Sequence, residues 1–349
     1  MAAPTRERTI PTTRAKSGLL RKLALFTLFS AWCAGPAAGA GADVAEAEAL
    51  FRSGKYDECA KLATAELGKG AWDESWSALK IKSELARGKQ AAAILTLGGA
   101  LRRFPASLSL HLLARDVYRA SGHDEEAAAE MDVIAKLVTA APQRYGAPEN
   151  RVALGRFFLA RGADARKVLD QFYDVATKDR PDFVEAYLAT AELALEKQDF
   201  GLAADTLHKA PKEAAQDPRF HYLLACAFSN DDRAQAVKEL SEALKINPRH
   251  VDSLLLQADH LIDAEKYAEA EQVLKQVVEV NPIEPKMWAY RAVIAHLKGD
   301  RDAEAKARRS ALAPWAKNPE VDHLIGRKLS QKYRFAEGSA YQKRALEMD

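Results

Sequence analysis

Two rows of carboxylates with the same spacing are the residues of this 349-residue chain whose types could do chemistry. Within each row the acidic residues lie at positions i, i+7 and i+11, offsets that place side chains on one face of an α-helix. Rows of carboxylates on neighbouring helices attract cations and accept charge-assisted hydrogen bonds. They predict binding of a basic or amine-bearing segment, with a solvated acidic helix face as the alternative. The rows are Glu185, Glu192 and Glu196, and Asp252, Asp259 and Asp263.

The sequence contains none of the common short catalytic or nucleotide-binding motifs. His-Glu-x-x-His, Gly-x-Ser-x-Gly, Gly-x-x-x-x-Gly-Lys and Cys-x-x-Cys are all absent. His260, His296 and His323 follow one another along the chain, but their local contexts differ, so a shared metal site is not predicted. We predict that the chain is not an enzyme and that it uses no cofactor or metal.

Three pairs of basic residues near the C-terminus raise nucleic-acid binding as an alternative. Aromatic residues are not interleaved with them in a stacking pattern, so we predict solvated helix faces and no nucleic-acid partner. The pairs are Arg308-Arg309, Arg327-Lys328 and Lys343-Arg344.

The elements that must position the acidic rows form an internal repeat. Gly54, Gly88 and Gly122 are 34 residues apart, each between two apolar helix-like runs. In the C-terminal half a turn residue recurs every 33 or 34 residues, and Asn-Pro pairs close units there, because proline cannot continue a helix. A two-helix unit of this length buries its apolar face only by stacking on its neighbours. The turn residues are Phe200, Arg233, Tyr267, Arg301 and Phe335, and the Asn-Pro pairs begin at Asn247, Asn281 and Asn318.

Small residues recur where the two helices of a unit must approach closely. Ala258 and Ala270, followed by Pro282, show this pattern, with larger apolar residues around them. The pattern resembles the tetratricopeptide repeat family over residues 43–349. The resemblance implies an all-α, right-handed superhelical solenoid of antiparallel helix pairs, with about nine repeats. Glu304 departs from it, because a small residue is expected at that position.

The resemblance also implies a concave groove, lined by the first helices of the repeats, that binds a peptide or a partner helix. Leu188 and Leu255 share one groove position, where they would supply apolar anchors. The expected function is a protein-interaction scaffold. The alternative is the N-terminal substrate-positioning module of a longer envelope enzyme, such as a metallopeptidase-like protein. The predicted partner-binding residues are Glu185, Leu188, Glu192, Glu196, Tyr222, Asp252, Leu255, Asp259 and Asp263.

Residues 1–42 lie outside the repeats and have the pattern of a secretory signal. A basic region precedes an apolar run from Leu23 to Ala34, and small residues up to Ala42 provide an Ala-x-Ala cleavage site. We therefore predict an exported protein of the periplasm, cell envelope or extracellular medium, with an uncleaved membrane anchor as the alternative. The predicted domains are the signal (1–42), three repeats (43–141), an interrupting loop (142–147) and six repeats (148–349).

Two further features of the sequence concern possible partners: the uneven distribution of charge along the chain and the end of the last repeat. Residues 148–281 carry 17 basic and 24 acidic residues, whereas residues 282–349 carry 14 basic and 9 acidic residues. Such segregation steers charged partners. The sequence has no polar capping helix after the last repeat, which leaves self-association through that repeat as a further alternative.

Overall fold

The computed structural model describes residues 43–348, and the predicted signal segment lies outside the described residues. Within 43–348 every regular element is helical, which confirms the all-α solenoid. No helix in this range has both the length and the apolar character needed to span a bilayer. The helices are α1 (Val44–Arg52), α2 (Tyr56–Gly68), α3 (Glu74–Ala86), α4 (Gln90–Arg103), α5 (Leu108–Ala120), α6 (Asp124–Ala140), η1 (Pro142–Tyr145), α7 (Pro148–Ala160), α8 (Ala165–Val168), η2 (Leu169–Tyr173), α9 (Asp174–Asp179), α10 (Val184–Glu196), α11 (Phe200–His208), η3 (Lys212–Gln216), α12 (Pro218–Phe228), α13 (Arg233–Ile246), α14 (Val251–Asp263), α15 (Tyr267–Val280), α16 (Pro285–Leu297), α17 (Arg301–Leu312), α18 (Pro319–Gln331) and α19 (Phe335–Leu346).

Local sequence fixes where the paired helices begin and turn. Asp73 accepts a hydrogen bond from the backbone N–H of Ser75 at 2.8 Å, and Ser107 accepts one from Leu110 at 3.2 Å. These bonds satisfy amide groups that have no partner inside the helix. Gly54 has a φ of +76°, a conformation that costs glycine little. The glycine-centred turns predicted from the repeat therefore join the two helices of a pair.

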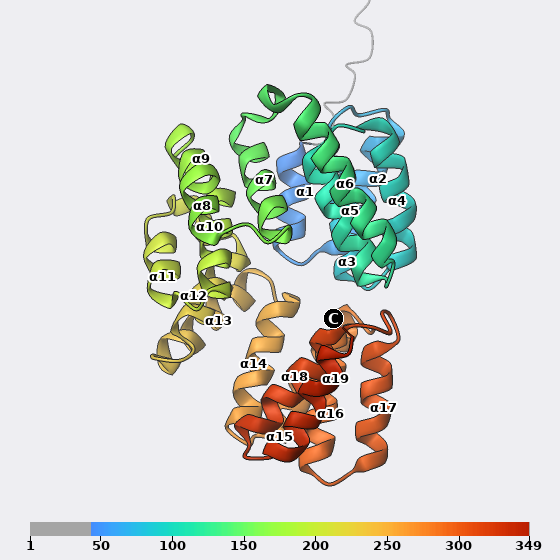
Figure 1. Cartoon of the computed structure of the whole chain (residues 1–349), viewed down its shortest axis with the longest axis vertical. Coiled ribbons are helices and arrows are strands. Elements are labelled where there is room, and N and C mark those ends of the chain that lie inside the picture. The colour runs from blue at the N-terminus through green and yellow to red at the C-terminus, as the bar shows by residue number, and fades with distance from the viewer. Residues whose placement is uncertain (1–42, 349) are drawn as a thin grey trace, which may run out of the picture. The chain divides into compact units, whose positions relative to one another are not determined.

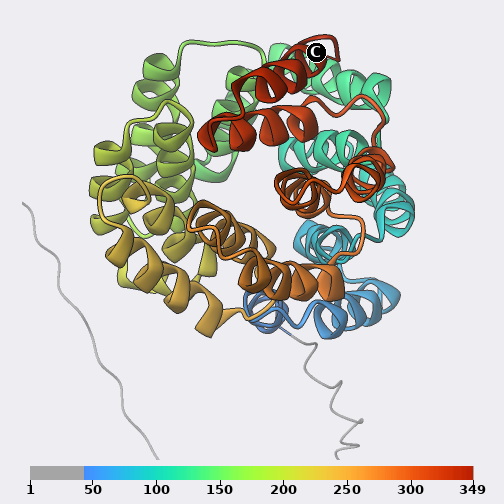
Figure 2. The ribbon, with the colours of Figure 1, turned by 90° about the horizontal axis from the view of Figure 1, so that it is seen from below.

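Successive helix pairs stack side by side and coil into a superhelix (Figure 1). Seen from below the view of Figure 1, the pairs follow one another around a ring (Figure 2). The chain returns to its first pair after about 190 residues, because the Tyr56 hydroxyl of α2 donates a hydrogen bond to the Arg249 carbonyl at 3.4 Å. Residues far apart in the sequence thus enclose a common interior.

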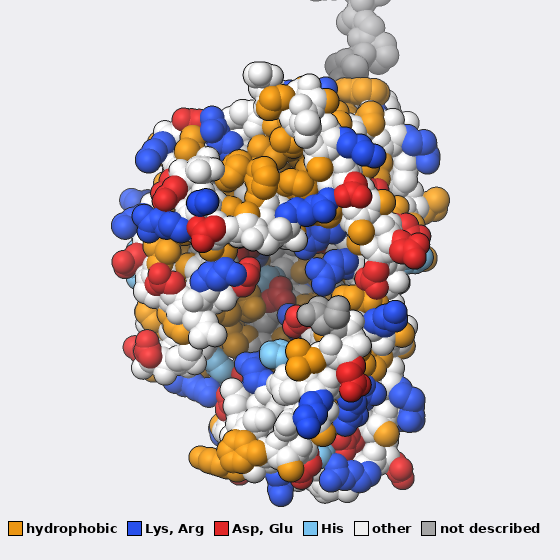
Figure 3. Space-filling view, in the orientation of Figure 1, with side chains coloured by type: hydrophobic (Ala, Val, Ile, Leu, Met, Phe, Trp, Pro, Cys, Tyr) orange, Lys and Arg blue, Asp and Glu red, His pale blue; other side chains and the backbone are white. Residues whose placement is uncertain are grey.

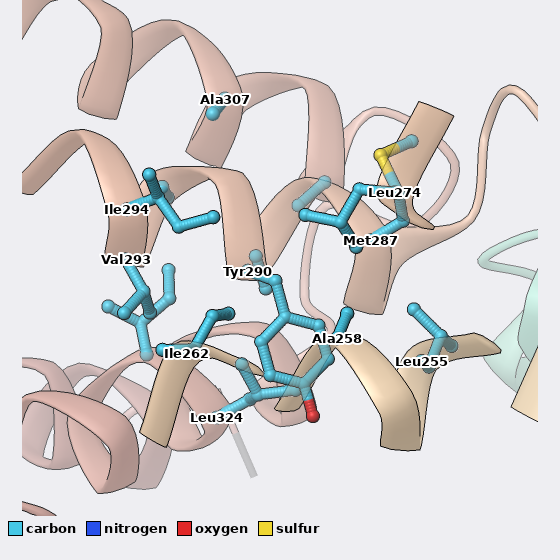
Figure 4. Packing of buried hydrophobic residues seen from close by; sticks show 14 of the residues in the cluster. Leu255, Ala258, Ile262, Leu274, Met287, Tyr290, Val293, Ile294, Ala307 and Leu324 are labelled. Carbon is cyan, nitrogen blue, oxygen red and sulfur yellow. The ribbon is translucent and has the colours of Figure 1, made fainter. Parts of the chain in front are cut away.

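Neighbouring helix pairs share the apolar core. The largest cluster joins helices α14 to α19, and Figure 4 shows Leu255, Ala258 and Ile262 of α14 facing Met287 and Tyr290 of α16. Ala258 is fully buried there, as expected where two helices approach closely. Stacking between units, rather than a single central core, therefore stabilises the array.

Glu304, which breaks the repeat pattern, is buried in a polar network. Its carboxylate accepts hydrogen bonds from His296 Nδ1 and Arg301, both at 2.9 Å, and from the Tyr341 hydroxyl. A buried carboxylate requires such partners, since an unpaired one is costly. This network joins α17 to α16 and α19 through polar groups. It explains why a glutamate occupies a position where the repeat pattern predicts a small residue.

The second helix of the fourth pair contains a π-helical turn. This turn, η2, places Tyr173 against Gly155 of α7, where an added Cβ would lie 2.2 Å from Tyr173 Cε1. Turns of this kind insert a residue into a helix and re-aim its side chains. The second helix of this pair thereby packs Tyr173 into space that is open only because residue 155 is glycine.

The segment 142–147 contains η1 and packs against the helices around it. Tyr145 is buried in a cluster with residues of α5, α6 and α7, and its hydroxyl donates to the Ala106 carbonyl at 3.3 Å. The segment therefore contacts helices on both sides of it in the chain.

Candidate functional site

A cavity of about 1060 Å³ lies inside the superhelix, between the first three helix pairs and later pairs. Figure 3 shows a hollow on this face of the molecule, with charged side chains around it. Eight carboxylates and three Lys or Arg side chains belong to the lining. The charged lining is thus predominantly acidic. It consists of Glu48, Asp116, Asp182, Glu185, Glu213, Asp217, Asp252 and Glu284, with Arg52, Lys82 and Arg219.

Glu185 lies between two arginines on neighbouring helices. It is 2.7 Å from Arg156 of α7 and 2.9 Å from Arg219 of α12. Burial alone would raise the pKa of Glu185, but Arg219 and Arg156 outweigh burial and hold the pKa well below its usual range. This carboxylate is therefore engaged in a ladder of charges across three helix pairs.

Glu192 and Glu196 line a second cavity, of about 810 Å³, on the same side of α10. Glu192 contacts Arg156 at 3.0 Å, and Glu196 is exposed beside Lys197 at 2.8 Å. Asp116 lines both cavities, so the two are adjacent.

Asp252 is exposed, lines the central cavity, and has no ion pair within 43–348. Glu284, at the start of α16, shares that lining; burial raises its pKa, and the charge of Asp252 raises it further. Tyr222 is half-buried, with its ring 5.8 Å from that of His250, and burial raises its pKa well above the usual value. Asp252 and Glu284 thus lie on the α14 and α16 side of this interior, and Glu48, Asp182 and Glu213 of the lining also form no ion pair among the described residues.

Asp259 and Asp263 are bound to a lysine of the ninth pair. Lys328 Nζ lies 2.7 Å from each carboxylate, and the Tyr290 hydroxyl donates to Asp259 at 2.8 Å. Lys328 is almost completely buried. The prediction of a solvated basic face was wrong for Lys328. It was also wrong for Arg308 of α17, which binds the buried Asp322 of α18. In both cases the packing of neighbouring helices brings a carboxylate to the basic side chain.

Leu188 and Leu255 do not reach the interior surface. Leu188 is fully buried in a cluster of α10 to α12, and Leu255 packs against α16 (Figure 4). The apolar-anchor role needs an exposed side chain, so neither residue provides an anchor in this conformation. The physical reason is that the next helix pair covers this position.

Sequence reasoning missed Glu48, Lys82 and Asp116 in the lining. These residues occupy equivalent first-helix positions of the first three units, 34 residues apart. Burial lowers the pKa of Lys82, with Glu185 opposing that effect. The 34-residue spacing could have identified them as one row, but not as the wall opposite Glu185.

The described residues contain no group of three or more His, Cys, Asp or Glu side chains arranged to hold a metal ion. His296 instead binds Glu304, and His323 lies 3.0 Å from Gln342. These histidines therefore take part in helix packing.

Two family models, both described as tetratricopeptide repeat, match residues 153–218 and 227–294. These ranges contain Arg156 and Glu185 of the ladder, but not Arg219, and they contain α10 and α14, the helices that carry the acidic rows. No curated protein matches the sequence.

A solved structure with a TM-score above 0.5 supports the fold. A chain of the APC/C hetero-tetramer Cut9–Hcn1 aligns with a TM-score of 0.57 and 13% identity over 86% of this chain. The alignment spans 59% of the length of that chain. The human IFIT1 dimer aligns with a TM-score of 0.47 and 15% identity, covering 87% of this chain and 77% of its own. At these identities the likeness concerns the helical solenoid alone.

Proposed function

Because the chain is a tetratricopeptide-repeat protein, we propose that it is a non-enzymatic scaffold that holds an extended, basic segment of a partner protein inside its superhelix. Repeat folds of this kind present stacked helices as a rigid surface, so binding needs little ordering of the scaffold. The observation that carries the proposal is the predominantly acidic lining of the central cavity.

Carboxylates that are already in ion pairs hold neighbouring helices in place, and carboxylates without an ion pair attract the basic segment of the partner. Glu185 and Asp259 are already neutralised by arginine and lysine, and displacing those partners would leave buried charges uncompensated. Asp252 has no such partner within 43–348 and shares the lining with Glu284. A lysine or arginine of the bound segment would gain charge-assisted hydrogen bonds there.

Fluorescence anisotropy with a short, labelled Lys/Gly/Ser peptide tests this function. The Asp252→Asn/Glu284→Gln variant should bind the peptide about tenfold more weakly, because both changes remove charge from the cavity. The matched control is Glu279→Gln/Asp302→Asn, which removes the same charge at exposed positions outside the cavity. Equal weakening in both variants would contradict cavity binding and indicate a general charge effect.

We further propose that the scaffold works outside the cytoplasm. The support is the sequence of residues 1–42, in which a basic region, a short apolar run and small residues follow one another. Mass spectrometry of the N-terminus from a native envelope fraction tests this: a mature chain beginning near Gly41 or Asp43 is expected. A chain that retains residues 1–42 in the cytoplasm contradicts it.

A further inference from the structure

Turns of the first three helix pairs contact loops of later pairs at a constant register. Cβ atoms added at Gly54 and Gly88 would lie 2.2 Å from Asn247 Oδ1 and 2.3 Å from Asn281 Oδ1. An added Cβ at Gly122 would lie 3.2 Å from Trp315 Cδ1. Each pair of residues is 193 apart in the sequence. We call this line of contacts the seam.

Hydrogen bonds hold the first part of the seam. Arg249 Nη1 donates to the Gly54 carbonyl at 3.1 Å, and Asn247 Nδ2 donates to the Tyr56 hydroxyl at 3.1 Å. The Arg249 guanidinium also lies over the Tyr56 ring, 5.5 Å from its centroid. Farther along, Trp315 Nε1 donates to Asp124 at 3.1 Å.

No cluster of buried apolar side chains crosses the seam in residues 43–348. Each of the six clusters joins pairs that follow one another along the chain, such as α3 with α5 or α14 with α16. Opening the seam therefore separates no shared apolar cluster and uncovers only single apolar groups, such as Ile283 and Trp315, while water replaces the hydrogen bonds that are lost. The stacking within the superhelix, by contrast, is held by burial.

The seam is also a wall of the central cavity. Tyr56, Asn247 and Asn281 belong both to the seam and to the lining that contains Glu185 and Asp252. An internal segment of a partner polypeptide continues as chain at both of its ends. Such a segment could enter the cavity from the side only where the superhelix separates.

We propose that the seam is a gate: it opens reversibly to admit the bound segment into the cavity and closes over it. The use of the gate rests on the proposed function, whereas its opening is a property of the free protein. The superhelix separates at the seam because the contacts there are mainly polar, whereas the stacking of consecutive helix pairs buries apolar side chains.

Crosslinking tests whether entry needs the gate. In the full chain with Cys33, Cys59 and Cys226 replaced by Ala, Lys55→Cys and Pro248→Cys are joined by a short bismaleimide; both positions line a small pocket at the seam. The expected result is that the association rate of the Lys/Gly/Ser peptide falls about tenfold or more. The control crosslink joins Asp57→Cys and Arg87→Cys, an ion pair between consecutive units, and should leave the rate unchanged. An unchanged rate with the seam crosslinked overturns the gate.

A second measurement needs no peptide. Single-molecule energy transfer between dyes at Lys55→Cys and Pro248→Cys should reveal exchange between a closed and an open population. Gly88→Ala should raise the open population about fivefold relative to Gly162→Ala, because both glycines have positive φ but only Gly88 contacts the opposite side. One closed population in all variants overturns the gate. If no form binds peptide yet the open population responds to Gly88→Ala, the proposed function fails and the gate stands.

Discussion

Lys328 Nζ lies 2.7 Å from Asp259 Oδ1, although one residue belongs to the ninth helix pair and the other to the seventh. The lysine reaches past the eighth pair, where the Tyr290 hydroxyl donates to the same carboxylate. A charge that is nearly inaccessible to water thus joins three successive units. Removing Lys328 leaves the buried Asp259 with the Tyr290 hydroxyl and the more distant Arg327, at 3.8 Å, and without its close ammonium partner.

We predict that Lys328→Ala lowers the free energy of unfolding by about 3 kcal/mol, because Asp259 then lacks its ammonium partner. Urea unfolding followed by circular dichroism measures this loss. The control Lys343→Ala changes an exposed lysine of α19 and should have little effect. Equal loss in both variants would show that Lys328 is not specifically paired.

Gly155→Ala should lower the free energy of unfolding by about 1–3 kcal/mol, because the added Cβ would collide with the Tyr173 ring. Gly99→Ala is the control: Gly99 also lies within a helix, but nothing surrounds its Cβ position, so a modest gain in stability is expected. Thermal unfolding of both variants checks the prediction. Stabilisation by Gly155→Ala would contradict the packing of η2 on α7.

Glu185 should stabilise the protein at neutral pH and lose that effect in acid. Its pKa is lowered in the folded state, so its contribution is complete above the ordinary value of 4.5 and declines as the pH falls toward the folded value. Glu185→Gln should therefore be less stable near neutral pH and lose less stability on acidification. Urea midpoints at neutral and acidic pH provide the measurement, with Glu279→Gln as control. The same pH dependence in both variants would argue against the ladder.

Lys82→Gln should bind the basic peptide about threefold more tightly, because the change removes one of the cations in the cavity lining. Lys275→Gln removes the same charge from an exposed position of α15 outside that lining. Anisotropy titrations at low and high salt measure both affinities, and the gain should shrink as salt screens the charges. A gain shared by Lys275→Gln would assign it to net charge.

The repeat was predictable because its signals are local. Gly54 and Gly88 mark turns that need positive φ, and Asn281-Pro282 marks a helix end, so short stretches of sequence were enough to predict the helix pairs. Sequence periodicity also found the face that carries Glu185 and Asp252. It did not exclude Leu255, since a 3.6-residue period does not reveal how far the next pair covers that face.

The partners of the charged residues could not be predicted in the same way. Lys328 and Asp259 are separated by two units, and Lys82 lies across the interior from Glu185. Those approaches depend on the small rotation between successive units, which accumulates over the whole array and has no local sequence signal.

The seam repeats with the same 34-residue period as the chain, because Gly54 meets Asn247 and Gly88 meets Asn281. If one whole unit between these residues were lost or duplicated, each glycine turn would lie opposite a different inter-unit loop at the same position of the repeat, so the register of the seam would be kept. An insertion of only a few residues in a loop between them would misalign both contacts at once. The fold therefore constrains how the gene can change length, and it favours exchange of entire repeats over small insertions.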